Sequence, residues 1–130
     1  MRVLFVDDDA MNRRVVRDML QLAGVTLEEA PDGETGLAMV GAADYAIVLM
    51  DLRMPGMDGL TAIRHIRERA DEKCTVPVIV VTADTSLNIR EDCLAVGADD
   101  VLMKPVAMKA LFKAMGQLVA ARAKASALSA

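Results

Sequence analysis

The feature that most constrains the fold is an alternation of short apolar runs with longer amphipathic segments along the chain. The runs are rich in Val and Ile and lack polar alternation, which is typical of strands buried on both faces of a parallel sheet. They cover residues 3–6, 25–27, 46–50, 78–81 and 101–103, of which 25–27 is the weakest. The segments between and after them have helical periodicity, at about 10–24, 33–43, 58–72, 86–96 and 107–122.

This order of five strand–helix pairs predicts an α/β fold, a doubly wound (βα)5 arrangement with helices on both faces of a five-stranded parallel sheet. We expect the flavodoxin-like strand order 2-1-3-4-5. In the helix predicted over 58–72, Ile63 and Ile66 fall on an apolar stripe. Arg64, His65 and Arg67 fall on the polar face, so we expect all three to be solvated.

The length and composition fit one such domain. A chain of 130 residues has room for a single core, and 54% apolar residues are enough to fill it. The net charge of -4 argues against a nucleic-acid-binding surface. No apolar run approaches the ~20 residues that span a bilayer, so we expect no membrane association. Cys74 and Cys93 form no CxxC motif, which favours a reduced, cytoplasmic protein.

Polar residues collect where the apolar runs stop. Asp7 and Asp8 follow the first run, and Asp51, Thr82 and Lys104 follow the third, fourth and fifth. Ligands of open α/β sheets bind beyond the carboxyl ends of the strands, where the strand order reverses. With the order 2-1-3-4-5 the three aspartates converge there. Two charges ~4 Å apart repel by about 4 kcal/mol at an effective dielectric near 20, so we expect a cation among them.

Magnesium fits this set of side chains, with Mn²⁺ as a substitute. Mg²⁺ prefers oxygen ligands, is often held by one or two carboxylates, and keeps waters that a phosphate oxygen can replace. Lys104 supplies a fixed positive charge and Thr82 a hydroxyl donor for phosphoryl oxygens. A carboxylate nucleophile with a metal, an ammonium and a hydroxyl is what in-line phosphoryl transfer requires.

Four motifs, in this order and on these strands, closely resemble the response-regulator receiver family over roughly residues 1–121. They are Val6-Asp7-Asp8-Asp9, Met50-Asp51-Leu52-Arg53-Met54-Pro55-Gly56-Met57-Asp58-Gly59, Val81-Thr82-Ala83 and Lys104-Pro105. The resemblance implies that Asp51 is the phosphoacceptor and that Asp8 and Asp51 bind the metal directly. It implies that Asp7 binds through water and that the main-chain carbonyl of Arg53 is a further ligand.

The resemblance also assigns the remaining roles. Thr82 would be the switch hydroxyl and Lys104 the phosphate-binding cation, with a cis Lys104–Pro105 bond. The phosphodonor would be a histidine kinase or a histidine phosphotransfer protein, and the downstream target a protein that the sequence does not name. Such a domain catalyses only its own phosphorylation and dephosphorylation. One departure is Val101, at a position where many receivers carry a Tyr or Phe ring that turns inward on activation.

Other residues near these motifs have simpler interpretations. We expect Asp9 to cap the first helix, and Asp58 to act as a cap or turn residue, because Asp is favoured where helices begin. Met11 and Val15 fall at the rim of the first helix, beside the predicted acidic site. They are either scattered apolar residues of an ordinary surface or a small apolar patch where a phosphodonor docks, and we favour docking.

Two alternative functions share some of these residues. A haloacid-dehalogenase-like phosphatase uses an aspartate after the first strand, and Asp7 to Asp9 has its D-x-D spacing. However, Met11 stands where Thr or Val is expected, and the chain leaves little room for a substrate-selecting cap. A pseudo-receiver would have lost the acidic pair, the acceptor or the lysine, and all are present.

The predicted receiver domain spans 1–121. Residues 122–130 are Ala-rich without an apolar stripe, so we interpret them as a helix end or the stub of a linker. No segment resembles an output domain. The chain therefore either acts alone through partner binding or is a receiver from a longer protein, and residues 93–105 are similar to receivers of hybrid kinases and phosphorelays.

Overall fold

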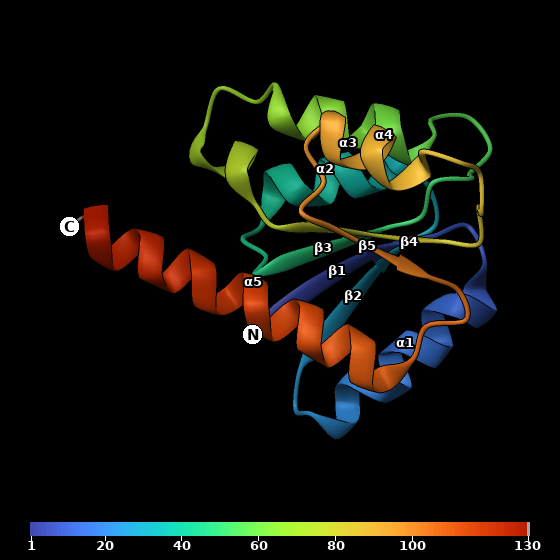
Figure 1. Ribbon diagram of the computed structural model, residues 1–130, viewed down its shortest axis with the longest axis horizontal. Coiled ribbons are helices and arrows are strands. Elements are labelled where there is room, and N and C mark those ends of the chain that lie inside the picture. The colour runs from blue at the N-terminus through green and yellow to red at the C-terminus, as the bar shows by residue number, and fades with distance from the viewer. Residues whose placement is uncertain (130) are drawn as a thin grey trace.

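The computed structural model describes residues 1–129, with side chains through residue 125. Five parallel strands form one sheet in the order β2-β1-β3-β4-β5, which confirms the predicted topology (Figure 1). The strands are β1 (Arg2–Val6), β2 (Thr26–Ala30), β3 (Ile47–Met50), β4 (Val78–Thr82) and β5 (Asp100–Met103). The strand order reverses between β1 and β3, and these two strands pair directly.

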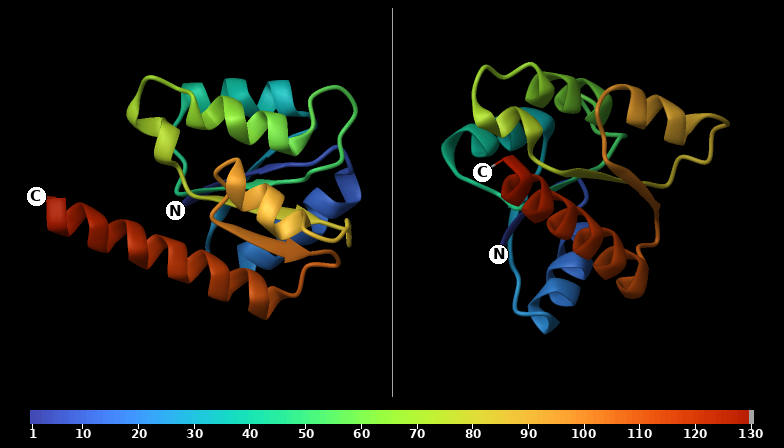
Figure 2. Two further views of the ribbon diagram at one scale, coloured as in Figure 1. Left: turned by 45° about the horizontal axis from the view of Figure 1, so that its top comes forward. Right: turned by 60° about the vertical axis from the view of Figure 1, so that its left-hand side comes forward.

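Helices cover both faces of the sheet in three layers (Figures 1 and 2). One face carries α1 (Ala10–Leu22) and α5 (Met108–Ser129), and the other carries α2 (Gly33–Ala42), α3 (Gly59–Arg67) and α4 (Ile89–Ala95). A short 3-10 helix, η1 (Glu72–Thr75), precedes β4. No described helix is both long enough and apolar enough to pass through a bilayer.

Two cores lie on opposite faces of the sheet and explain the uninterrupted apolar runs. In β1, Val3 and Phe5 pack with α1 and α5, whereas Leu4 and Val6 pack with α2 and α3. All four side chains are fully buried. Successive strand residues point to opposite faces. Because both faces are covered, no position in the strand tolerates a polar side chain.

The second strand is longer than its apolar run of 25–27 predicts. It continues through Glu28 and Glu29 to the buried Ala30. Since β2 is an edge strand, these carboxylates reach past the sheet and pair with arginines, Glu28 with Arg2 and Glu29 with Arg17. Because an edge strand can carry charged residues, the second half of β2 lacks the apolar run on which the prediction relied.

The fourth helix is shorter than predicted. The pattern over 86–96 indicated a helix, but α4 begins only at Ile89. Asn88, before it, has a left-handed backbone with φ 74° and makes no side-chain cap. Residues 83–88 instead form a loop that is fixed by the carboxylate of Asp84, which accepts hydrogen bonds from the amide and hydroxyl of Ser86.

The expectation that Arg67 is solvated was wrong, whereas Arg64 and His65 are exposed as predicted. The Arg67 guanidinium donates to the main-chain carbonyls of Gly97 (2.9 and 2.8 Å) and Val76 (2.6 Å), and also to that of Cys74. Helical periodicity places Arg67 on the polar face of α3, but the chain returns over that face before β4 and again before β5.

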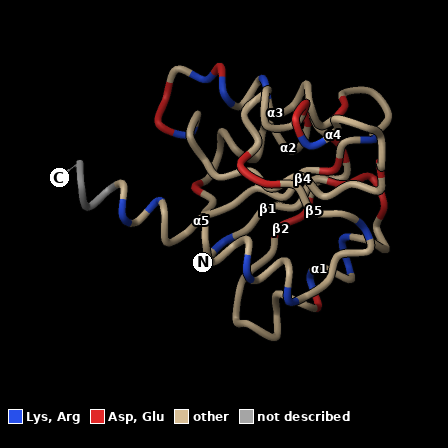
Figure 3. The backbone as a smooth tube through the Cα atoms, viewed as in Figure 1, with Lys and Arg blue, Asp and Glu red and all other residues tan. Residues whose placement is uncertain are grey.

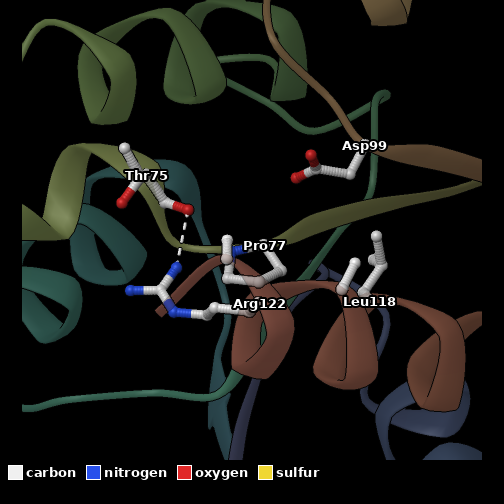
Figure 4. Close-up of a pocket in the computed structure, with 7 residues that line it drawn as sticks. Thr75, Pro77, Asp99, Leu118 and Arg122 are labelled. Carbon is white, nitrogen blue, oxygen red and sulfur yellow. Dashed lines mark hydrogen bonds between the residues drawn. The ribbon is translucent and has the colours of Figure 1, made fainter. Parts of the chain in front are cut away.

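The last helix continues past residue 122, where the prediction ended it, and projects beyond the sheet (Figures 1 and 2). Arg122 donates a 2.8 Å hydrogen bond to the carbonyl of Thr75, at the amino end of β4, beside a hollow lined by Pro77, Asp99 and Leu118 (Figure 4). Residues 122–129 thus belong to a helix end, one of the two interpretations of 122–130, and Ala130 lies outside the described residues. The domain boundary at residue 121 stays a prediction.

Candidate functional site

The three predicted aspartates converge at the carboxyl ends of β1 and β3. Pairing of the two strands continues past their ends, because the amide of Asp51 donates to the carbonyl of Val6 at 2.9 Å. Asp7 is fully buried and Asp51 is 4% exposed, whereas Asp8 is exposed. Oxygens of the three carboxylates all lie within 4.8 Å of one another. Acidic segments gather on this side of the molecule, where the strands end (Figure 3).

Lys104 reaches the same point from the end of β5. Its Nζ lies 3.0 Å from Oδ2 of Asp7 and 3.2 Å from Oδ1 of Asp51. Its main-chain amide bonds to the carbonyl of Thr82, and the bond to Pro105 is cis, as the resemblance implied. The sequence therefore placed the acids and the ammonium correctly relative to one another.

The ionisation of this cluster follows from burial and charge. Burial, and then the charge of Asp7, raise the pKa of Asp51 above its usual 3.8, and Lys104 offsets part of that rise. Burial alone would lower the pKa of Lys104, but the hydrogen bond to Asp7 and the charge of Asp51 outweigh it, so the pKa is raised. Lys104 is thus held as a cation beside a carboxylate whose charge is only partly compensated.

Thr82 ends β4 with its side chain fully buried. Its Oγ1 accepts a hydrogen bond from the amide of Asp84 at 3.0 Å, so the hydroxyl is tied to the following loop. Val101 lies on β5, opposite Val80 of β4. Its side chain is partly buried against the core under α2, α3 and α4. A valine therefore fills the space where the resemblance leads one to expect a ring.

The simpler interpretations of the flanking aspartates are confirmed. Asp9 caps α1, accepting from the amide of Met11 at 2.8 Å, and Asp58 caps α3, accepting from the amide of Thr61 at 2.8 Å. Met11 is 66% exposed, as expected for a residue at the rim of α1.

An ion pair that the sequence did not predict lies beside the aspartates. The Arg53 guanidinium, on the loop after β3, pairs with the carboxylate of Asp84, on the loop after β4. Hydrogen bonds from Ser86 and then the Arg53 guanidinium lower the pKa of Asp84 to about 2. From the sequence, a role was assigned only to the main-chain carbonyl of Arg53, as a metal ligand. The one feature that could have indicated the ion pair is the acidic residue two positions after Thr82.

A glycine fixes the loop that leads from β3 to α3. A Cβ on Gly59 would lie 2.2 Å from the main-chain oxygen of Asp51 and 2.9 Å from Cα of Leu52. No rotamer change can relieve a clash with backbone, so only glycine lets α3 begin against the predicted acceptor. The first turn of α3 therefore helps to hold Asp51 in place.

These groups line one open cavity of about 430 Å³ at the strand ends. Its lining residues are Asp7, Asp8, Asp9, Asn12, Asp51, Arg53, Ala83, Asp84 and Lys104. Carboxylate oxygens are the hard ligands that Mg²⁺ prefers, and within the described residues no histidine or cysteine joins the acidic group. The donor set therefore fits a hard divalent cation better than Zn²⁺.

Comparison with known proteins identifies the family that carries this arrangement. The protein-family model that describes the response regulator receiver domain matches residues 3–116 of this chain. The chain belongs to the response regulator receiver family of two-component signalling. The geometry agrees, since this receiver has the buried acids and the lysine on the strands where the motifs placed them.

Curated relatives of this receiver include the response regulators MprA of Mycobacterium ulcerans and Mycobacterium leprae. They are 37% identical over 118 residues and 39% identical over 111 residues. The matches cover 91% and 85% of this chain but only 50% and 47% of the relatives. The receiver thus spans about half the length of the curated relatives it matches.

Solved structures of receivers are also similar. The chemotaxis protein CheY4 of Vibrio cholerae has a TM-score of 0.82 at 31% identity, covering 90% of this chain and 97% of that one. The receiver domain of the sensor histidine kinase PA1611 of Pseudomonas aeruginosa has a TM-score of 0.84 at 31% identity, covering 92% and 97%. That structure is described with a magnesium ion coordinated in its active-site cleft.

Proposed function

We propose that this receiver accepts a phosphoryl group on Asp51 in a two-component system or phosphorelay. The observation that carries the proposal is the convergence of Lys104 and the carboxylates of Asp7 and Asp8 on the Asp51 side chain. The donor is a histidine kinase or a histidine phosphotransfer protein. A carboxylate oxygen of Asp51 forms the new P–O bond, the P–N bond of the donor phosphohistidine breaks, and the imidazole leaves.

The other side chains serve positioning and charge neutralisation, the main requirements of phosphoryl transfer. The ammonium of Lys104, 3.2 Å from Asp51, neutralises phosphoryl oxygens. The hydroxyl of Thr82 donates to one of those oxygens and so couples the phosphate to the loop after β4. Asp7, Asp8 and Asp51, with the carbonyl of Arg53, would hold Mg²⁺. The metal supplies charge neutralisation and orientation of the donor.

A docking place for the donor lies next to Lys104. A small hollow there is lined mainly by apolar side chains of α1, β1 and the β5–α5 loop, including Val15, Val16, Pro105 and Val106. Val15 is 45% exposed and Met11 lies one turn earlier on α1. Met11 and Val15, whose positions in the sequence suggested this role, give a donor protein an apolar contact beside the acceptor, whereas Val16 is buried beneath them. We expect this reaction to take place in the cytoplasm.

Intact mass spectrometry after incubation with acetyl phosphate and Mg²⁺ tests this function. We expect one added phosphoryl group, which EDTA prevents because the metal ligands are then empty. Asp51→Ala should abolish the addition. Asp58→Ala is the matched control, since Asp58 is an acid of the same loop that only caps α3. Labelling of Asp51→Ala as strong as that of the unaltered chain contradicts the proposal, and a label on Asp7 indicates the haloacid-dehalogenase-like phosphatase.

A further inference from the structure

An ion pair bridges the two loops that border the acceptor. Arg53 follows β3 and Asp84 follows β4, and both line the cavity that holds Asp51. The Arg53 side chain is 74% exposed, whereas that of Asp84 is only 8% exposed. The guanidinium therefore covers a nearly buried carboxylate at the rim of the cavity.

The same aspartate holds the Thr82 hydroxyl. The amide of Asp84 donates to Oγ1 of Thr82 at 3.0 Å, and the Asp84 carboxylate accepts from the amide of Ser86 at 2.8 Å. The rest of the loop has few anchors, since Leu87 is 89% exposed and Asn88 makes no side-chain cap. The position of this loop thus depends largely on the contacts of Asp84.

We infer that Arg53 and Asp84 are positioning residues for Thr82, and that their ion pair holds the hydroxyl and its loop in the resting arrangement. This inference rests on the proposed function. For Thr82 to donate to a phosphoryl oxygen on Asp51, its hydroxyl must turn toward Asp51. Either its bond from the Asp84 amide breaks, or Asp84 follows the hydroxyl and moves away from Arg53. The bridge holds Asp84 in place, and with it the amide that bonds to the hydroxyl, so it opposes the first route and must itself break in the second. It therefore opposes the phosphorylated arrangement.

The affinity for beryllofluoride, an analogue of the phosphoryl group, measures this opposition in the presence of Mg²⁺. Arg53→Ala keeps the main-chain carbonyl but removes the guanidinium, and it should bind the analogue roughly two- to fivefold more tightly, the scale of a partly exposed ion pair. Arg53→Lys keeps the charge and should return the affinity toward that of the unaltered chain. Arg69→Ala breaks a comparable ion pair with Asp71 away from the site and should change nothing.

Weaker binding of beryllofluoride by Arg53→Ala overturns the inference, because it means that the guanidinium contacts the phosphoryl group itself. Unchanged binding overturns it as well, because the bridge then has no influence on Thr82.

Hydrogen exchange of the unphosphorylated protein without Mg²⁺ gives a readout that does not depend on phosphoryl chemistry. Exchange at the amides of Asp84 and Ser86 should become faster in Arg53→Ala and stay unchanged in Arg69→Ala. Equal rates in Arg53→Ala and the unaltered chain contradict the bridge. If the unaltered chain neither takes phosphate nor binds beryllofluoride, the proposed function fails, while exchange still reports on the bridge.

Discussion

At the scale of single residues, consecutive aspartates have separate roles because the backbone turns at the end of β1. Asp7 is fully buried and bonds to Lys104, and Asp8 projects into the acidic cluster. Asp9 turns to the amide of Met11 and satisfies one of the free N–H groups at the start of α1. Chemically identical side chains thus differ in their contacts, because the turning backbone directs each of them to different neighbours.

This difference leads to a prediction for metal binding. Asp8→Ala should weaken Mg²⁺ binding strongly, because it removes an oxygen ligand from the cluster. Asp9→Ala should leave Mg²⁺ binding nearly intact but lower the free energy of unfolding by about 0.5–2 kcal/mol, the usual contribution of a helix cap. Calorimetric titration with Mg²⁺ and chemical denaturation of both variants measure the two effects. Equal losses of Mg²⁺ affinity would show that the ligands are wrongly assigned.

At the scale of elements, Arg67 joins segments that are far apart in the sequence. Its guanidinium bonds to carbonyls before β4 and before β5, and it lies 3.0 Å from the carboxylate of Asp99. Asp99 in turn accepts from the amide of Val78, the first residue of β4. Gly97 fits the arginine closely, since its backbone has φ +111° and a Cβ there would lie 2.7 Å from Cγ of Arg67. One side chain therefore fixes the amino ends of two strands to α3.

We predict that Arg67→Ala lowers the free energy of unfolding by about 1–3 kcal/mol, because carbonyls that it now satisfies lose their donor. Arg64→Ala is the matched control on the same helix. Arg64 is exposed, so its removal should change stability by less than about 0.5 kcal/mol. Urea denaturation of both variants measures the difference. Similar stabilities for the two would mean that water replaces the Arg67 contacts at no cost.

At the scale of the whole molecule, the proposed function requires a signal to pass from Asp51, at the strand ends, to a surface that a partner can bind. We propose Thr82 as the direct route, since its Oγ1 already accepts a hydrogen bond from the loop that leads into α4. Val101 cannot supply the ring motion, because a β-branched side chain has few χ1 states and little length. We therefore expect phosphorylation to reshape residues 83–96 with little change at residue 101.

Partner binding by phosphorylated variants tests this route. Thr82→Ala should accept phosphate yet gain no affinity for its partner, because a ligand shifts an equilibrium only through differential contacts. Val101→Ala should keep most of the phosphate-dependent gain and lose only some packing stability. Loss of the gain in Val101→Ala, together with its retention in Thr82→Ala, would show that the coupling runs through β5 instead.

The sequence alone was sufficient to predict the five-stranded sheet, its strand order, and the meeting of Asp7, Asp8, Asp51 and Lys104, although not the full length of the edge strand β2. The reason is that a strand buried on both faces must be apolar throughout, so its end is visible locally as the first charged residue. Parallel topology then brings those ends together. The caps at Asp9 and Asp58 were predictable for the same reason, since a cap bonds only to residues two or three positions away.

Only the tertiary structure decided the partners of the long charged side chains and the limits of weakly patterned elements. Arg53 and Asp84 are 31 positions apart, and Arg67 and Gly97 are 30 apart. No local pattern encodes such pairs, because an arginine on a polar helix face looks the same whether water or another loop covers it. The late start of α4 likewise follows from the contacts of Asp84, which hold residues 83–88 in a loop that helical periodicity does not detect.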